Sequence, residues 1–336
     1  MATTATAFWV SGQGSGWFED QVVPDPGPGE VCVRTLWSAV SRGTEALVFR
    51  GEVPADQHWR MRAPFQEGDF PGPVKYGYLS VGVVEAGVAD LVGRTVFCLY
   101  PHQTSYVVPA DDVDLVPDDV PARRAVLAGP VETAVNALWD VPPMIGDRVA
   151  VVGAGLIGCC LARVLGRVPG VEVTLVDVNP SRAEVAGHLG VDFALPTRAP
   201  TERDVVFHAS GRPEGLTHAL SLLADDGVVA ELSWYGDTQV SLPLGGDFHA
   251  RRLSIRGSQV GTVSPTRRRV RAQDWTPGHR RRLALDLLRD DAFDTLLTDT
   301  STLHDLPDLM ARIAQGDQDG LCHTIRYPSG DDACSS

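Results

Sequence analysis

The pattern of hydrophobic and polar positions changes character near residue 130. Before that point, apolar residues form short β-type runs separated by glycine- and proline-rich segments such as PDPGPGE and GDFPGP. Glycine and proline mark turns, so short interrupted runs of this kind are typical of an irregular β-barrel. The runs that carry this prediction are 31–35, 81–85, 95–100 and 106–108.

After Pro130, strand-like and helix-like patterns alternate along the chain. Such alternation is typical of βαβ units and predicts a parallel sheet. The predicted strands are 149–152, 171–176, 204–208, 228–232 and 253–257, and the predicted helices are 157–168, 182–189, 214–223 and 279–289. We therefore expect an α/β protein of two domains, one formed by residues 1–127 and completed by 293–336, the other by 128–292.

The charge balance and the cysteine pattern narrow the class of protein. Acidic residues outnumber basic residues by 43 to 29, which gives a formal net charge of −14. That charge repels a phosphate backbone, so nucleic acid is not expected as a partner. No apolar run approaches the roughly 18 residues of a membrane span, and the first residues lack a secretion-signal pattern. The six scattered cysteines are typical of free thiols, so we expect a cytoplasmic protein without membrane association.

A glycine-rich motif, Gly153-Ala154-Gly155-Leu156-Ile157-Gly158, lies between a predicted strand and a predicted helix. In this setting Gly153 permits a tight turn, Gly155 lets a pyrophosphate approach the backbone, and Gly158 lets the helix pack on the strand. The free N–H groups and the positive end of the helix favour a diphosphate. The motif therefore predicts a dinucleotide-binding domain.

Asp177 indicates which dinucleotide this is. It lies 24 positions after Gly153, at the end of the second predicted strand. A carboxylate at this point accepts hydrogen bonds from both adenosine-ribose hydroxyls of NAD, whereas it repels the 2′-phosphate of NADP. The predicted cofactor is therefore NAD.

Two clusters of arginines follow later in the chain. They are Arg267, Arg268, Arg269 and Arg271, and then Arg280, Arg281 and Arg282. Runs of like charge are usually solvated surface, and we expect this role for both clusters. The alternative is that they bind an anionic substrate or one edge of the cofactor.

Several segments match motifs of a known enzyme family. They are 42–45 (RGTE), 49–51 (FRG), 77–84 (GYLSVGVV), 93–96 (GRTV), 132–134 (ETA), 146–149 (GDRV) and the glycine motif. On these segments the chain resembles the medium-chain dehydrogenase/reductase superfamily, whose members are alcohol dehydrogenase-like, along nearly its whole length. The resemblance implies a GroES-like barrel followed by a Rossmann domain, a small-molecule substrate and a homodimer. SRGTE and PGPVKYGYLSVG look most like the bacteriochlorophyllide hydroxyethyl dehydrogenase branch.

The chain departs from zinc-dependent members of this superfamily at their metal ligands. Those members have a Cys-Gly-Thr/Ser-Asp segment where this chain has residues 42–45, and Gly-His-Glu where it has 77–79. No cysteine stands near Gly129, at the position of the third ligand, where Glu132 is the only candidate. The cysteine-rich structural-zinc lobe is missing as well. One carboxylate does not replace three zinc ligands, so we expect no bound metal.

A metal-free relative needs another group at the reacting oxygen. We expect Tyr78 to pass the proton, with its phenolate form favoured by Arg42 and with Thr44 connecting the site to solvent. Glu45 is expected to orient Arg42. The alternative is that Arg42 and Glu45 form a structural ion pair and that Tyr78 only fills the volume of a lost histidine.

The resemblance assigns further residues. Tyr100 corresponds to a substrate-pocket position, and His102 beside it is an additional candidate for proton transfer. The residues assigned to the cofactor outside the glycines and Asp177 are Thr133, Leu156, Ile157, Arg182, Ser210, Ser233 and Trp234. Trp234 and the neighbouring Tyr235 are equally compatible with a packing role, which is usual for large aromatic side chains.

The expected activity is NAD(H)-dependent, zinc-independent interconversion of an alcohol and a carbonyl on a specialised metabolite. One alternative is reduction of a conjugated C=C bond, as in the zinc-free quinone and enoyl reductases of the superfamily. Those relatives mostly use NADPH, so Asp177 argues against this alternative. A second alternative is a catalytically silent NAD-binding protein, which the loss of the zinc ligands would permit.

Overall fold

The computed structural model describes residues 3–264, 275–317 and 319–328. It divides into two compact units, one formed by residues 1–129 with 297–336 and the other by residues 130–296. The expected domain limits, 127/128 and 292/293, differ from these by two and four residues. None of the helices within the described ranges is both long enough and apolar enough to cross a bilayer.

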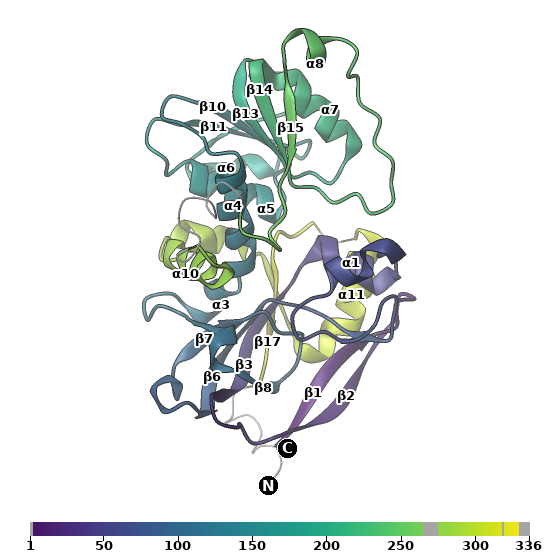
Figure 1. The fold of residues 1–336 in the computed structure, drawn as a ribbon, viewed down its shortest axis with the longest axis vertical. Helices are drawn as coiled ribbons and strands as arrows, with labels where there is room; N and C mark the ends of the chain where they lie inside the picture. The colour runs from purple at the N-terminus through teal and green to yellow at the C-terminus, as the bar shows by residue number, and fades with distance from the viewer. Residues whose placement is uncertain (1–2, 265–274, 318, 329–336) are drawn as a thin grey trace. The chain divides into compact units, whose positions relative to one another are not determined.

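The first unit is built mainly from antiparallel strands in two sheets (Figure 1). The first sheet has the order β2-β1-β5-β4 and consists of β1 (Thr3–Val10), β2 (Gly16–Val23), β4 (Glu67–Gly68) and β5 (Val74–Lys75). The second has the order β16-β17-β3-β6-β7-β9 and consists of β3 (Glu30–Val40), β6 (Ser80–Gly87), β7 (Thr95–Cys98), β9 (Val113–Leu115), β16 (Asp299–Thr302) and β17 (His323–Arg326), with β8 (Ser105–Pro109) paired to β3. Because β17 pairs with β3, the C-terminal segment completes this unit.

Alternating apolar positions of these strands form the core of the first unit. Val31 and Val33 of β3 pack with Val84, Val96 and Tyr106, as the period of two in a half-buried strand requires. The helices of the unit are α1 (Arg42–Arg50), α2 (His58–Met61), α3 (Ala122–Ala125) and α11 (Leu306–Gln315). Helix α1 contacts α11 within this unit.

The second unit contains a six-stranded sheet in the order β12-β11-β10-β13-β14-β15. Its strands are β10 (Arg148–Val152), β11 (Glu172–Val176), β12 (Asp192–Ala194), β13 (Arg203–His208), β14 (Leu223–Glu231) and β15 (Ser254–Gly257). Every neighbouring pair in this order is parallel, which confirms the predicted parallel sheet. The order reverses between β10 and β13, which is where open sheets of this type bind their ligands.

Helices cover both faces of this sheet. Leu216, Ala219 and Leu220 of α7 (Pro213–Leu222) pack on Val206 and Val229. Helix α5 (Leu156–Leu165) contacts β10 and β11 and is followed by α6 (Arg182–Leu189). The remaining helices near or in this unit are α4 (Ala128–Asp140), α8 (Asp247–Ala250) and α10 (Pro277–Leu287). The result is the doubly wound arrangement that the alternating pattern predicted.

The sequence prediction missed β1, β2 and α1. Strand β2 has no clean alternation of buried and exposed side chains, so its hydrophobic pattern carries no period-two signal. Helix α1 contains Gly43 and the β-branched Thr44, both poor helix formers. Burial of Ala46, Val48 and Phe49 on one side of α1 outweighs that local preference.

Candidate active site

The glycine motif forms a turn in which each glycine meets a different constraint. Gly153 has a φ of +106°, and a Cβ there would lie 2.6 Å from the backbone nitrogen of Ser210. A Cβ on Gly158 would lie 1.8 Å from the carbonyl oxygen of Gly153, whereas one on Gly155 would meet nothing within 4 Å. Gly153 and Gly158 therefore close the turn, and the backbone at Gly155 is open to a ligand.

Asp177 lies directly at this loop. One of its carboxylate oxygens accepts the N–H of Ala154 at 2.6 Å, and the other accepts the N–H of Asn179 at 2.8 Å. Arg182 begins α6. Burial raises the pKa of the Cys159 thiol, the charge of Arg182 lowers it, and the charge of Asp177 raises it, so both charges lie near this thiol. An open glycine loop with a carboxylate at its side is the donor and acceptor set that a dinucleotide requires, so the residues fit this group.

Four other residues assigned to the cofactor are half-buried. Leu156 and Ile157 are half-buried in the first turn of α5, Thr133 is half-buried in α4, and Trp234 is half-buried in the segment after β14. Their assignment to the cofactor stays a prediction.

Ser210 and Ser233 belong to a hydrogen-bonded cluster that the sequence reasoning missed. His208 ends β13 and Glu231 ends β14, and the Nδ1 atom of His208 lies 2.9 Å from both carboxylate oxygens of Glu231. The Nε2 atom of His208 lies 2.6 Å from the hydroxyl of Ser210. The backbone N–H of Ser233 and the hydroxyl of Tyr235 donate to Glu231 at 2.6 and 3.2 Å. We refer to these five residues as the strand-end cluster.

The sequence held one signal for this cluster. His208 and Glu231 are polar residues at the final position of strands whose preceding residues are mostly apolar. Ends of neighbouring parallel strands meet at one edge of a sheet, so a polar residue at each end was reason enough to consider a pair.

In the first unit, Tyr78 is a hydrogen-bond donor rather than a phenolate. Its hydroxyl donates to the Ser41 hydroxyl at 2.6 Å. Burial, followed by the nearby Glu45 carboxylate, raises the pKa of Tyr78 to about 12, although hydrogen bonds with Ser41 and Thr44 oppose the shift. Tyr78 therefore holds its proton at neutral pH.

The expectation that Arg42 favours a phenolate at Tyr78 is wrong in this structure. The Nη1 atom of Arg42 donates to the carbonyl oxygen of Gly320. The causes that act on the pKa of Tyr78 are burial, the Glu45 carboxylate and two hydroxyl groups, and together they raise it. The physical reason is that the loss of hydration at the phenol outweighs the other influences.

Glu45 contacts His102, and its expected role in orienting Arg42 stays a prediction. The Nε2–H of His102 donates to a Glu45 carboxylate oxygen at 3.0 Å, and the other oxygen accepts the N–H of Ser41 at 2.8 Å. The Nδ1 atom of His102 lies 2.8 Å from the Ser38 hydroxyl, which is 3.1 Å from the hydroxyl of Tyr327. Glu45 and His102 are both buried, so they belong to an internal polar network.

Tyr100 packs in the core of the first unit, and its expected role in the substrate pocket stays a prediction. Its ring stacks on that of Tyr106 with centroids 3.7 Å apart and an interplanar angle of 7°. The buried ammonium of Lys75 lies 5.5 Å from the Tyr100 ring and 2.7 Å from Gln103 Oε1. Burial raises the pKa of Tyr100, so its phenol stays neutral and serves packing.

The side chains at the former ligand positions do not fit a zinc ion. Arg42 is a cation bonded to a carbonyl group, and Tyr78 is a protonated phenol. Glu132, the remaining candidate ligand, is buried and accepts a hydrogen bond from Arg280 Nε at 3.0 Å. Within the described part of the chain, no group of three or more histidine, cysteine, aspartate or glutamate side chains is arranged to hold a metal ion. Three protein ligands are the usual minimum for a catalytic zinc.

Arg280 also corrects the expected surface role of the second arginine cluster. It is 2% exposed, and its guanidinium donates to Glu132, to Asn136 and to the carbonyl oxygens of Val260 and Thr262. Its hydrogen bonds therefore connect α10 to α4 and to the segment 260–262 inside the second unit. The first cluster, residues 267–271, lies outside the described residues.

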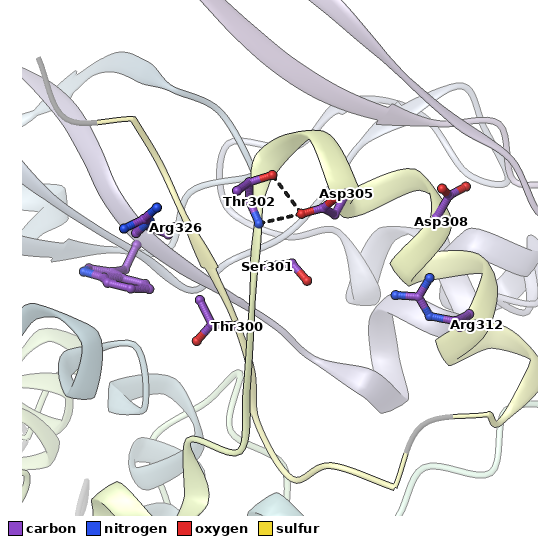
Figure 2. A pocket seen from close by; sticks show the side chains of 8 residues that line it. Thr300, Ser301, Thr302, Asp305, Asp308, Arg312 and Arg326 are labelled. Carbon is purple, nitrogen blue, oxygen red and sulfur yellow. Dashed lines mark hydrogen bonds between the residues drawn. The ribbon is translucent and has the colours of Figure 1, made fainter. Parts of the chain in front are cut away.

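A polar groove of about 500 Å³ lies elsewhere in the first unit (Figure 2). Asp305 accepts two hydrogen bonds from Thr302, both at 2.8 Å, and caps the start of the helical segment. Arg326 and Arg312 lie on opposite sides of Ser301 in Figure 2. The groove is lined from β3, β16, β17 and α11, whereas Tyr78 lies just before β6 and its partner Ser41 just before α1.

Comparison with known proteins agrees with this fold. Residues 153–274 match the family described as zinc-binding dehydrogenase. D-guloside 3-dehydrogenase of Escherichia coli (strain K12) is 26% identical over 255 residues, which cover 67% of this chain and 73% of that protein. L-threonine 3-dehydrogenase of Rhizobium etli is 27% identical over 231 residues, covering 61% of this chain and 66% of that protein.

Solved structures match over nearly the whole chain. L-idonate 5-dehydrogenase from Escherichia coli has a TM-score of 0.79 at 16% identity, covering 97% of this chain and 99% of that one. An Escherichia coli alcohol dehydrogenase (rspB) complexed with NADH has a TM-score of 0.75 at 18% identity, covering 96% and 99%. A zinc-binding dehydrogenase from Sinorhizobium meliloti bound to NADP has a TM-score of 0.77 at 17% identity, covering 96% and 99%. The fold is thus a GroES-like unit with a Rossmann unit, as in these alcohol dehydrogenase-like structures.

Proposed function

We propose that the protein is an NAD(H)-dependent oxidoreductase that interconverts an alcohol and a carbonyl on a specialised metabolite. The observation that carries this proposal is the carboxylate of Asp177 at the open glycine loop, bonded to the N–H of Ala154 at 2.6 Å. A carboxylate at this point suits the ribose diol of NAD and disfavours a 2′-phosphate. The nearby cation Arg182 would favour a 2′-phosphate, so the preference between NAD and NADP is tested by direct measurement below.

The chain's own residues have distinct roles in this proposal. Backbone N–H groups at residues 155–158 would hold the diphosphate, and Asp177 would accept hydrogen bonds from the adenosine ribose. The cofactor supplies or accepts the hydride. Tyr78, protonated at neutral pH because its pKa is about 12, donates a proton to the carbonyl oxygen during reduction. The relatives named above are dehydrogenases of D-guloside, L-threonine and L-idonate, which supports a polar hydroxyl compound as the substrate.

The cofactor proposal is tested by calorimetric titration with NADH and with NADPH. We expect tighter binding of NADH, and Asp177→Asn should narrow the difference between the two cofactors. Asp192→Asn is the matched control, because Asp192 is an exposed carboxylate on the edge strand β12. Tighter binding of NADPH by the wild-type chain would contradict our interpretation of Asp177 and favour C=C reduction. Turnover with alcohols, aldehydes and enones then separates the two reactions.

We further propose that the reaction is independent of zinc. The support is that Arg42 and Tyr78 stand at the positions of metal ligands and that Glu132 is bonded to Arg280. Elemental analysis of the purified protein should find no stoichiometric zinc, and turnover should persist in a chelator. One zinc per chain, with turnover lost on its removal, would contradict this proposal.

A further inference from the structure

The polar groove of the first unit brings together several kinds of binding group (Figure 2). Its volume of about 500 Å³ is within the usual range for small-molecule sites. An indole ring, three hydroxyl groups, two carboxylates and two guanidinium groups line it, and they belong to Trp37, Thr300, Ser301, Thr302, Asp305, Asp308, Arg312 and Arg326. Donors, acceptors and one aromatic face in the same cavity suit a ligand that is rich in hydroxyl groups.

The hydroxyl groups along β16 are held in fixed orientations by their neighbours. The Thr300 hydroxyl lies 2.8 Å from that of Thr324 and accepts a hydrogen bond from Nη2 of Arg123 at 3.0 Å. The Ser301 hydroxyl lies 2.8 Å from Nε2 of the buried His323. A cavity whose polar atoms are already in place loses little conformational entropy when a ligand binds.

The two arginines of the groove have guanidinium groups that no carboxylate neutralises at close range. Acidic residues outnumber basic residues in this chain by 43 to 29, yet no ion pair within the described ranges includes Arg312 or Arg326. Both side chains are exposed, and they lie on opposite sides of Ser301 in Figure 2. The planar guanidinium group matches the geometry of a carboxylate or a phosphate.

The helical side of the groove combines a cation with carboxylates. Asp308 and Arg312 belong to α11, and Asp305 directly precedes this helix. Hydrogen bonds from Thr302 lower the pKa of Asp305, and the charge of Arg312 acts in the same direction, so this carboxylate is ionised at neutral pH. The cation on this side is therefore opposed by carboxylates, which accept hydrogen bonds from ligand hydroxyl groups.

The strand side of the groove is positive. Arg326 of β17 is paired in register with Trp37 of β3, and residues paired in this way point to the same face of the sheet. The guanidinium carbon of Arg123 lies 5.9 Å from the centre of the Trp37 ring, and its Nη2 atom donates to Thr300, so a second cation borders this side. Both carboxylates that line the groove lie on the helical side, so an oxyanion is attracted to the strand side.

We propose that this groove binds a polyhydroxylated compound with one terminal oxyanion group, which is the shared chemistry of sugar acids and sugar phosphates. The oxyanion group accepts hydrogen bonds from the guanidinium of Arg326. The C–H face of the carbon skeleton packs on the ring of Trp37. Hydroxyl groups at the other end of the ligand donate to the carboxylates of Asp305 and Asp308.

The groove and the buried polar network around His102 lie on opposite faces of the same strands. Trp37 and Arg326 line the groove, whereas the next residues along the chain, Ser38 and Tyr327, hydrogen-bond to each other, and Ser38 also contacts His102. Successive side chains of a strand point to opposite faces. The groove is therefore a second site, and binding there requires neither the cofactor nor the proposed reaction.

The test is calorimetric titration of the full chain, without NAD(H), with D-glucuronate, D-glucose 6-phosphate and D-glucose. We expect at least one of the two anions to bind at millimolar concentrations and D-glucose to bind about tenfold more weakly or less, because it has no oxyanion group for Arg326. Arg326→Met should weaken binding of that anion by about 10- to 100-fold, the usual contribution of a hydrogen bond to a charged group. It should leave D-glucose binding unchanged. The anion that binds more tightly identifies the terminal group as a carboxylate or a phosphate.

Two further variants separate the contact at Arg326 from a general change of charge. Arg326→Lys keeps the positive charge without the planar guanidinium, so it should retain part of the affinity for the anion. Arg94→Met is the matched control. Arg94 is an arginine of the same unit that pairs with Asp118 at 3.4 Å, and it directly precedes β7, four strands away from β16 in the sheet. This control should leave all the affinities unchanged.

Three results would overturn the inference: no binding of either anion, equal affinity for the anions and D-glucose, or unchanged anion binding by folded Arg326→Met. Equal weakening by Arg326→Met and Arg94→Met would overturn it as well, because the effect would then be one of net charge. Should Arg326→Met fail to fold, Arg326→Lys and the wild-type preference for an anion over D-glucose decide. No titration contains the cofactor, so failure here leaves the proposed NAD(H)-dependent function standing, and failure of that function leaves this site standing.

Discussion

The two units hold their candidate functional groups in different ways. In the second unit, the glycine loop presents backbone N–H groups, and its shape depends on two glycines, Gly153 and Gly158, within six positions of the chain. In the first unit, the Tyr78 hydroxyl donates to Ser41, directly before α1, and Glu45 of α1 is hydrogen-bonded to His102, which is 57 positions away. Backbone sites of the first kind depend on local geometry, whereas side-chain networks depend on the complete fold.

This difference determines how each unit should respond to substitution. A backbone site is damaged by adding atoms, because a new Cβ either clashes within the turn or blocks the ligand. A side-chain site is damaged by removing atoms, because a lost hydroxyl or charge leaves its partner without a hydrogen bond. Each prediction below either removes a side-chain group or adds atoms at the glycine loop.

The largest effect is expected at Tyr78, the side-chain site. Tyr78→Phe removes only the hydroxyl that donates to Ser41. With a substrate for which the proton step limits turnover, the rate should fall by about 10²- to 10⁴-fold, the usual contribution of a positioned acid or base. NADH affinity, measured by calorimetry, should not change. Turnover close to that of the wild type would mean that Tyr78 only fills space.

The buried ion pair of the second unit should show the next largest effect. Arg280→Met leaves Glu132 without its 3.0 Å partner in a buried position. Removing one member of a buried pair typically costs about 3–5 kcal/mol of unfolding free energy. Chemical denaturation measures the loss, and Arg282→Met, at an exposed arginine of the same helix, is the control. Equal effects of the two substitutions would contradict an internal bracing role for Arg280.

The glycine loop supplies a pair of substitutions that separates folding from binding. Gly155→Val adds atoms where nothing lies within 4 Å, whereas Gly158→Val drives them into the carbonyl of Gly153. We expect Gly155→Val to keep the wild-type melting temperature and to weaken NADH binding about 100-fold, equivalent to about 2.7 kcal/mol. Gly158→Val should lower the melting temperature, because overpacking a closed turn is destabilising. Normal NADH affinity in Gly155→Val would contradict a diphosphate at this loop.

Local features were predictable from the sequence, whereas side-chain networks between distant residues were not. The parallel sheet, the glycine loop and the position of Asp177 were predictable because their signals are local and periodic. Arg280 was misinterpreted as surface because its partner Glu132 is 148 positions away, and charge runs carry no information on burial. His208 and Glu231 form a pair only because β13 and β14 end side by side.

The raised pKa of Tyr78 predicts a distinctive pH dependence. Oxidation of an alcohol requires the phenolate as base, and with a pKa of about 12 its fraction grows about tenfold per pH unit below that value. The oxidation rate should therefore rise from pH 7 to 10 without a plateau, provided that the proton step limits turnover. Reduction uses the protonated phenol and should be nearly constant over this range. A plateau in the oxidation rate near pH 7–8 would assign the base to another group, with His102 the first to examine.

The smallest effect is expected at Arg42. The guanidinium of Arg42 donates to the carbonyl of Gly320, and the pKa of Tyr78 is governed by burial, by Glu45 and by hydrogen bonds to Ser41 and Thr44. Arg42→Met should therefore shift the oxidation pH profile by less than about half a pH unit, which corresponds to less than about 0.7 kcal/mol. Glu45→Gln, which removes the carboxylate that raises the Tyr78 pKa, should move the profile toward lower pH. Because lowering the pKa of a base makes more of it available at a given pH, the oxidation rate of folded Glu45→Gln should exceed that of the wild type at pH 8. An alkaline shift of the profile in Arg42→Met would restore a direct role for this charge beside the phenol.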